Sequence, residues 1–144
     1  PEGVGGAIVH ALKYDGWWRA ADGMAREIAR LGWPDDVVEE RRAVVPVPLA
    51  PARERERGYN QCVSIGRALA RAWGVPLWDD VVSRIRATPS QTRLTPGERL
   101  ANVAGAFRVD ATARDRLRGA HVVIVDDVVT TAATLNACAG ALVA

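Results

Sequence analysis

The chain has 144 residues, the size of one domain, and a domain of this length buries about 70% of the surface that the unfolded chain exposes. Hydrophobic residues make up 49% and charged residues 25% of it, which excludes a disordered, collagen-like or coiled-coil protein. The net charge of +2 demands no polyanionic partner, and no apolar run reaches the roughly 18 residues of a membrane helix. Residues 1–20 lack a signal-peptide pattern, so we expect a single cytoplasmic domain over 1–144, not inserted in a membrane.

Two cysteines, Cys62 and Cys138, stand far apart in the sequence, each within an apolar pattern of helical spacing. This placement favours two buried thiols over a disulfide or a metal site. Two distant cysteines and two distant histidines cannot supply the four ligands of a structural zinc ion, so zinc within this chain is excluded.

The first half of the chain predicts a helix, a strand and a second helix. Apolar residues at helical spacing predict a helix over 18–31, and the β-branched run of residues 43–48 predicts a strand whose prolines take its last residues out of the sheet. Asn60 is a suitable N-cap for the next helix, which has one apolar face and ends at Gly74.

The second half begins with residues 77–85, whose pattern fits either a strand or a helix. Residues 86–102 are polar and predict a long loop that leads into a helical turn from Glu98 to Val103. The remaining elements are a strand over 106–109, a turn or helix over 111–118, a fully buried strand over 122–125 and a helix over 132–143. Such alternation is typical of an α/β fold with a parallel sheet, whose ligands bind at the carboxyl ends of the strands.

The candidate ligand-binding residues lie within residues 122–134. The apolar strand ends at Asp126 and Asp127, and a turn rich in threonine then opens a helix. Backbone N–H groups and hydroxyls at a helix N-terminus suit a phosphate, and the two carboxylates suit vicinal hydroxyls or a hydrated Mg²⁺. Together they describe a site for a ribose 5-phosphate. In an isolated acidic pair, one Asp would more simply cap the helix and the other would form a hydrogen bond at the surface.

The sequence of residues 122–134 as a whole favours the ligand site over the helix cap. It closely resembles the signature with which type I phosphoribosyltransferases bind 5-phosphoribosyl 1-pyrophosphate (PRPP). The resemblance implies that Asp126 and Asp127 are catalytic residues that hold the ribose diol, and it leaves open a contact with a metal through water. It assigns the 5-phosphate to five consecutive residues, Thr130, Thr131, Ala132, Ala133 and Thr134. The family has Gly at the position of Ala132, where a methyl group is expected to narrow the loop or disfavour a positive φ.

Residues 44–61 resemble the Val-Pro-Val-Pro and Arg-x-Arg-x-Arg-Gly-Tyr-Asn-Gln stretch of the ComF family, the competence-associated branch of phosphoribosyltransferase-like proteins. The resemblance implies a Rossmann-like parallel sheet flanked by helices, with a flexible loop over the site. Relatives also carry an N-terminal zinc ribbon and a final strand, which we do not find in this chain. Alternating Arg and Glu alone would indicate a solvated surface. The resemblance instead assigns the pyrophosphate to Arg53, Arg55 and Arg57, whose guanidinium groups bind phosphates in bidentate fashion.

The long polar loop is either a connector or a mobile flap over the ligand. The resemblance favours the flap and implies that Arg86, Gln91 or Arg93 reaches the substrate, closing the site against water. The sequence does not rank these three residues.

Two functions of different classes follow. The first is Mg²⁺-dependent transfer of a phosphoribosyl group from PRPP, or binding of a related ribose phosphate, with an unknown nitrogenous acceptor. The second is a module without catalytic activity that handles single-stranded DNA during DNA uptake, together with proteins of the competence machinery. In the second, the tryptophans would stack on bases, with Trp17 and Trp18 as the best exposed candidates.

Overall fold

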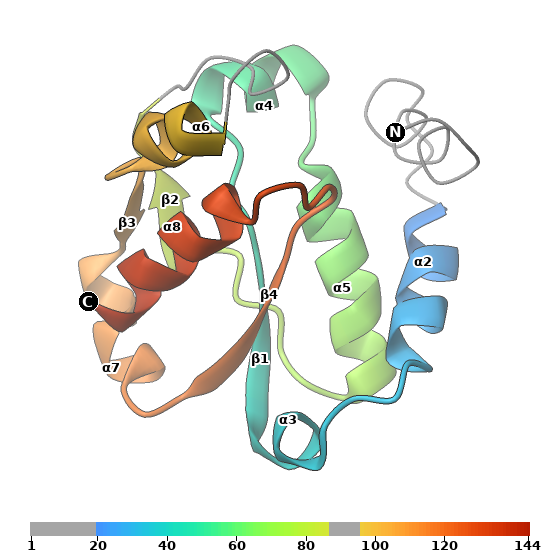
Figure 1. Cartoon of the computed structure of the whole chain (residues 1–144). Coiled ribbons are helices and arrows are strands. Elements are labelled where there is room, and N and C mark those ends of the chain that lie inside the picture. The colour runs from blue at the N-terminus through green and yellow to red at the C-terminus, as the bar shows by residue number, and fades with distance from the viewer. Residues whose placement is uncertain (1–19, 87–95) are drawn as a thin grey trace.

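The computed structural model of the protein describes residues 20–86 and 96–144 (Figure 1). The helices and strands follow in the order α2 (Ala20–Ala29), α3 (Asp35–Glu40), β1 (Arg41–Pro46), α4 (Pro51–Arg57), α5 (Gln61–Trp73), β2 (Val82–Arg84), α6 (Pro96–Val103), β3 (Phe107–Val109), a 3₁₀ turn (Ala111–Ala113), α7 (Arg114–Leu117), β4 (His121–Val125) and α8 (Ala133–Val143).

Strands β1 and β4 run parallel at the centre of the fold, with Val44 opposite Val123 and Pro46 opposite Val125. The ladder ends where the Val47 N–H donates to the Val125 carbonyl at 2.9 Å. On the other side of β1, the Trp78 N–H donates to the Val44 carbonyl at 2.9 Å. The parallel sheet predicted from the alternation of elements is confirmed. Residues 43–46 of β1 are buried, because β4 and residues 77–78 lie along the two edges of the strand and other elements cover both of its faces.

The two faces of this sheet are covered by different elements (Figure 1). Helix α5 packs on one face and α2 packs against α5, and Val44 joins a cluster there with Ile65 and Leu69 of α5. Helix α8 and the antiparallel pair β2–β3 cover the other face, where Val45 joins a cluster with Cys138. Neighbouring residues of β1 thus point to opposite cores, as the period of a strand requires.

Several local predictions are resolved. The ambiguous residues 77–85 contain the short strand β2, which pairs with β3 in an antiparallel sheet that the sequence pattern did not indicate. The helix capped by Asn60 is confirmed, and it ends at Gly74 with the left-handed φ of 66° that glycine adopts without a steric penalty. Helix α3 was not expected, and α6 begins at Pro96 rather than at Glu98.

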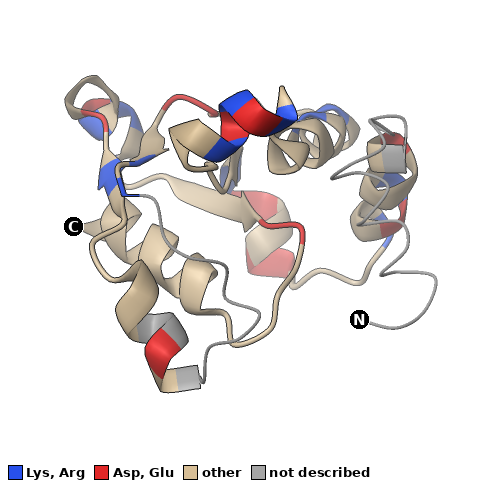
Figure 2. Ribbon diagram, turned by 90° about the horizontal axis from the view of Figure 1, so that it is seen from above, with Lys and Arg blue, Asp and Glu red and all other residues tan. Residues whose placement is uncertain are grey.

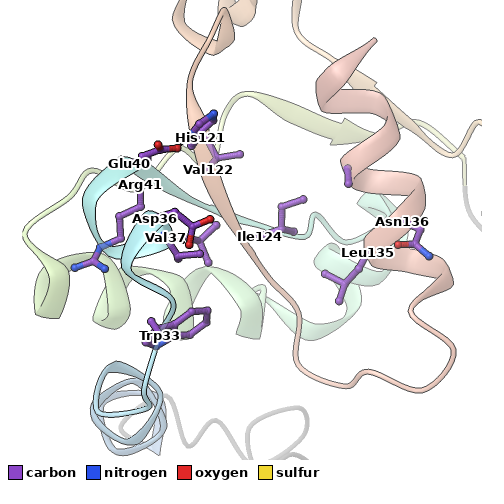
Figure 3. A pocket seen from close by; sticks show the side chains of 12 residues that line it. Trp33, Asp36, Val37, Glu40, Arg41, His121, Val122, Ile124, Leu135 and Asn136 are labelled. Carbon is purple, nitrogen blue, oxygen red and sulfur yellow. Dashed lines mark hydrogen bonds and ion pairs between the residues drawn. The ribbon is translucent and has the colours of Figure 1, made fainter.

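The prediction of a fully buried strand over residues 122–125 is wrong for most of that strand. Only Val125 is buried, and the three residues before it are half-buried. Among the described residues, β4 pairs with β1 alone. A groove of about 550 Å³ lies beside β4, between α3 and α8 (Figure 3). Trp33, Val37 and Leu135 line it, and an ion pair between His121 and Glu40 stands at its end near the start of β4.

Both cysteines are buried and neither forms a disulfide, as predicted from their placement. Trp33 and Trp73 pack edge to face with ring centroids 5.3 Å apart, so these two contribute to packing. Trp17 and Trp18 lie outside the described residues. No described helix is both long enough and apolar enough to span a membrane.

Candidate functional site

The acidic pair stands where β4 ends, at the carboxyl edge of the parallel sheet. The β-branched run from His121 to Val125 forms the strand, and the chain leaves the sheet at Asp126 and Asp127, both half-buried. The carboxyl end of β1 lies beside them because the two strands are parallel. The edge that sequence reasoning selected for the ligand is therefore the edge that carries the two carboxylates.

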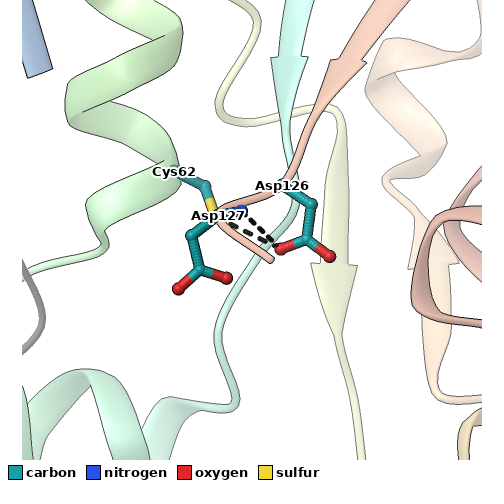
Figure 4. Close-up of side chains that lie close together, drawn as sticks. All are labelled: Cys62, Asp126 and Asp127. Atoms are coloured by element: carbon teal, nitrogen blue, oxygen red, sulfur yellow. Dashed lines mark hydrogen bonds between the residues drawn. The ribbon is translucent and has the colours of Figure 1, made fainter. Parts of the chain in front are cut away.

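Hydrogen bonds from the first turn of α5 hold both carboxylates. The Gln61 Nε2 donates to Asp127 Oδ2 at 2.8 Å, and the Cys62 thiol donates to Asp126 Oδ1 at 3.6 Å. The same Asp126 oxygen accepts the backbone N–H of Asp127 at 2.9 Å. Figure 4 shows Cys62 directed toward the acidic pair from the side of α5. The pair is thus oriented by residues more than sixty positions earlier in the chain.

The first turn of α5 is itself fixed to the sheet by Asn60, which is buried. Its Oδ1 accepts the backbone N–H of Cys62 at 2.9 Å, which caps the helix. Its Nδ2 donates to the carbonyl of Val47 at 3.0 Å, just past the end of β1. Asn60 therefore acts as a cap and as a clamp, and its side chain is occupied with backbone groups rather than turned to a ligand.

Burial governs the protonation of this cluster. Burial, and then the charge of Asp127, raises the pKa of Asp126 to about 6. Burial, and then the charges of Asp126 and Asp127, raises the pKa of Cys62 well above its usual value. Burial raises the pKa of Cys138 to about 12. Both thiols are consequently protonated at neutral pH, and Cys62 acts toward Asp126 as a hydrogen-bond donor.

The predicted phosphate turn follows the acidic pair and ends at Ala132, which has φ 54° and ψ 11°. Ala132 adopts the positive φ that its methyl group was expected to disfavour. This conformation costs a residue with a Cβ about 1–2 kcal/mol. Thr130 is exposed, Thr134 is half-buried and Ala133 is buried at the start of α8. These residues and Asp126 line a cavity of about 20 Å³.

Two features of this turn suit an anion. Ala132 gives α8 no side-chain cap, and the first N–H groups of a helix have no acceptor within the helix itself. The Thr131 hydroxyl is buried and has no hydrogen-bond partner within the described part of the chain. Buried hydroxyls normally have a partner, so the turn offers donor capacity that a bound group would use.

The arginine segment forms the helix α4. In α4, Arg53 and Arg57 are one turn apart and half-buried, whereas Arg55 is exposed. Figure 2 shows basic and acidic residues alternating along this helix. The Arg57 Nη1 donates to the Oε1 of Gln61 at 3.4 Å. The helix form therefore brings Arg57 to the side chain that holds Asp127.

The predicted flap residues are described only in part. The Arg86 Nη2 donates to the carbonyls of Asn102 and Ala104 at 3.0 and 2.7 Å, so Arg86 ties the end of β2 to the end of α6. Gln91 and Arg93 lie outside the described residues. The roles of all three toward a ligand stay predictions.

Three residues of this region escaped sequence reasoning as functional candidates: Gln61, Cys62 and Arg84. The sequence does carry a signal for Gln61, because a glutamine in the first turn of an apolar helix is an amide that needs partners once it is buried. Arg84 stacks over Phe107 at 5.4 Å, and burial together with the charge of Arg53 lowers its pKa. No local pattern marks Arg84, because β2 has only three residues.

The acidic cluster suits a hydrated magnesium ion better than a directly bound one. Cys62, Asp126 and Asp127 offer donor atoms within 4.8 Å of one another. Mg²⁺ prefers six oxygen ligands and keeps several waters, and a protonated thiol is no ligand for it. The carboxylate oxygens already accept hydrogen bonds from α5, so they fit contact with metal-bound water or with hydroxyl groups.

Residues 59–143, more than half of the chain, match the Phosphoribosyl transferase domain family. The chain is 34% identical over 137 residues to the DNA utilization protein YhgH of Escherichia coli K12, covering 89% of this chain and 56% of that protein. It is 36% identical over 94 residues to Competence protein F of Haemophilus influenzae, covering 65% of this chain and 41% of that one.

A third relative is Competence protein ComFC of Bacillus subtilis, 32% identical over 100 residues, which are 69% of this chain and 37% of that protein. The chain spans about half the length of the curated relatives that it matches. No solved structure gives a significant match. The matched family and these relatives confirm the resemblance stated from the motifs: the chain belongs to the phosphoribosyl transferase domain family, in its competence-associated ComF branch.

Proposed function

We propose that the domain binds PRPP, or a related ribose phosphate, together with Mg²⁺ and transfers the phosphoribosyl group to a nitrogenous acceptor. One observation carries the proposal. At the carboxyl edge of the sheet, the acidic pair lies between an uncapped helix start with a buried hydroxyl and a helix that bears three arginines. Such a row of donor, acceptor and cationic groups matches a 5-phosphate, a diol and a pyrophosphate in turn.

Each group has a distinct task in this reaction. The residues from Thr130 to Thr134 anchor the 5-phosphate, Asp126 and Asp127 accept hydrogen bonds from the ribose hydroxyls, and Arg53, Arg55 and Arg57 neutralise the pyrophosphate. The bond from ribose C1 to the pyrophosphate oxygen breaks, a bond from C1 to the acceptor nitrogen forms, and the proton of that nitrogen is released. Mg²⁺ bound to the pyrophosphate would stabilise the charge of the leaving group. Holding the ribose between its two phosphate ends supplies the positioning that such a reaction needs.

Calorimetric titration of the domain with PRPP, with and without Mg²⁺, tests this proposal. We expect saturable, Mg²⁺-dependent binding that Asp126→Ala/Asp127→Ala weakens at least about 100-fold, since charge-assisted hydrogen bonds to both hydroxyls are lost. The matched control is Asp35→Ala/Asp36→Ala, which removes an exposed acidic pair from the start of α3 and should leave the affinity unchanged. A folded wild type that does not bind PRPP contradicts the proposal.

The names of the relatives favour a second candidate function, the handling of single-stranded DNA in DNA uptake. Competence and DNA utilization stand in those names, and the exposed Arg55 offers a cationic group to a phosphate backbone. Titration with an oligonucleotide at several salt concentrations tests it. We expect quenching of tryptophan fluorescence and affinity that falls steeply with salt. Proteins of the competence machinery would be partners in that role.

The two functions are separable in one set of measurements. Turnover of PRPP with a nitrogenous acceptor supports the enzyme, and oligonucleotide binding without PRPP binding supports the DNA module. Both proposals place the domain in the cytoplasm, which fractionation of cells that produce it would test.

A further inference from the structure

Gln61 is a buried polar side chain that lies between two charged groups of the site. It is 2% exposed, and both ends of its amide are engaged. Its Oε1 accepts the Arg57 Nη1 at 3.4 Å, and its Nε2 donates to Asp127 Oδ2 at 2.8 Å. A neutral amide thus links a guanidinium of α4 to a carboxylate that follows β4.

The two partners fix the orientation of this amide. An arginine offers only donors and an ionised carboxylate only acceptors. The oxygen of Gln61 must therefore face Arg57 and its nitrogen must face Asp127. If the amide turned over, its nitrogen would meet the guanidinium and its oxygen would meet the carboxylate, and both hydrogen bonds would be lost.

This arrangement gives Arg57 an influence on Asp127 that does not require contact between them. Arg57 holds the amide in the orientation in which Gln61 donates to Asp127, and that donation keeps one oxygen of the carboxylate on the side of α5. The other oxygen then faces away from Gln61. A rotation of the Gln61 side chain would therefore change both hydrogen bonds together.

We propose that Gln61 is a positioning residue that couples the arginine helix to the acidic pair, so that the pyrophosphate end and the ribose end of the ligand bind with positive cooperativity. The proposal rests on the proposed function for the identity of the ligand. Gln61 is 2% exposed and its amide is directed at Arg57 and Asp127, so we assign it a role that acts through these two residues.

A double-mutant cycle with Arg57→Met and Gln61→Met tests the coupling, with ribose 5-phosphate as the probe because it carries no pyrophosphate. We expect Arg57→Met to weaken ribose 5-phosphate binding about 3- to 10-fold in the wild-type background and to have no effect in the Gln61→Met background. Arg67→Met, which removes an exposed arginine of α5 paired with Asp79, is the control for lost charge and should change nothing. An unspecific electrostatic effect of Arg57 would instead persist in both backgrounds and would overturn the coupling.

A measurement without ligand separates this inference from the proposed function. The side-chain amide protons of Gln61, followed by ¹⁵N NMR, should exchange with water several-fold faster in Arg57→Met and in Asp127→Asn than in the wild type, and no faster in Arg67→Met. Failure of the wild type to bind ribose 5-phosphate counts against the proposed function, and this exchange then decides the inference. Unchanged exchange in Arg57→Met overturns it, whatever the ligand, and the unfolding midpoint of each variant shows whether it is folded.

Discussion

The acidic pair and the turn that follows it leave the same strand, but they are held in place by different kinds of interaction. Asp126 and Asp127 are oriented by side chains of α5, far away in the sequence. The turn that ends at Ala132 depends on a left-handed backbone conformation and on the start of α8. The acidic pair thus depends on tertiary packing, whereas the turn depends on local backbone geometry.

The largest effect should come from loosening α5, the support of the acidic pair. Ile65 is 1% exposed in the core beneath this helix, and Ile65→Ala should lower the free energy of unfolding by about 2–5 kcal/mol. Leu135→Ala, at a half-buried position under the turn, should cost about 1–2 kcal/mol because less apolar area is lost. Urea denaturation of both variants measures the difference. Equal losses in the free energy of unfolding would contradict the claim that tertiary packing matters more for the acidic pair than for the turn.

The next effect concerns the charge of Asp126. A pKa raised from 3.8 to about 6 means that the folded state holds its proton more tightly than the unfolded state, so stability should fall as the pH rises from about 4 to about 6. This loss amounts to at most about 3 kcal/mol. Asp126→Asn should abolish it and be more stable than the wild type at pH 8, with little difference at pH 4.

Denaturation at pH 4, 6 and 8 checks this prediction. Asp115→Asn, which changes an exposed carboxylate paired with Arg118, is the control and should follow the wild type at every pH. A wild type whose stability is flat over this range would show that Asp126 is not buried against its neighbour as described.

Removal of the clamp at Asn60 should have an intermediate effect. Asn60→Ala deletes the cap of α5 and leaves the buried carbonyl of Val47 without its donor, which together should cost about 2 kcal/mol. Asn60→Ser keeps a cap oxygen but has no amide that reaches Val47, so it should retain part of the stability. If both variants lost the same amount, the clamp to Val47 and not the cap would carry the whole effect.

The smallest effect concerns the turn that ends at Ala132. Ala132→Gly removes the methyl group from a residue with φ 54° and should stabilise the fold by up to about 1 kcal/mol. It should leave the pH dependence assigned to Asp126 unchanged. Thermal unfolding measures the gain, with Ala139→Gly inside α8 as the control that should destabilise by about 1 kcal/mol.

Local signals in the sequence identified much of this molecule. The β-branched runs predicted β1 and β4, the Asn60 and Gly74 signals predicted the bounds of α5, and the motif predicted which sheet edge carries the acidic pair. The contacts that complete the site could not be predicted in this way. Gln61 and Cys62 meet the pair only because β1 and β4 are neighbours, and the half-burial of Val122 to Ile124 depends on what lies beside β4.

The parallel pairing of β1 with β4 also bears on how the protein acquires its site during folding. Its two strands stand near opposite ends of the described chain, and the hydrogen bond from Gln61 to Asp127 closes a separation of 66 positions. Contacts between residues so distant form slowly, since the loop must be closed before the contacts compensate for the lost entropy. During synthesis from the N-terminus, α2, β1 and α5 emerge first and can pack together. The acidic pair, and with it the candidate site, becomes complete only after β4 has left the ribosome and docked against β1.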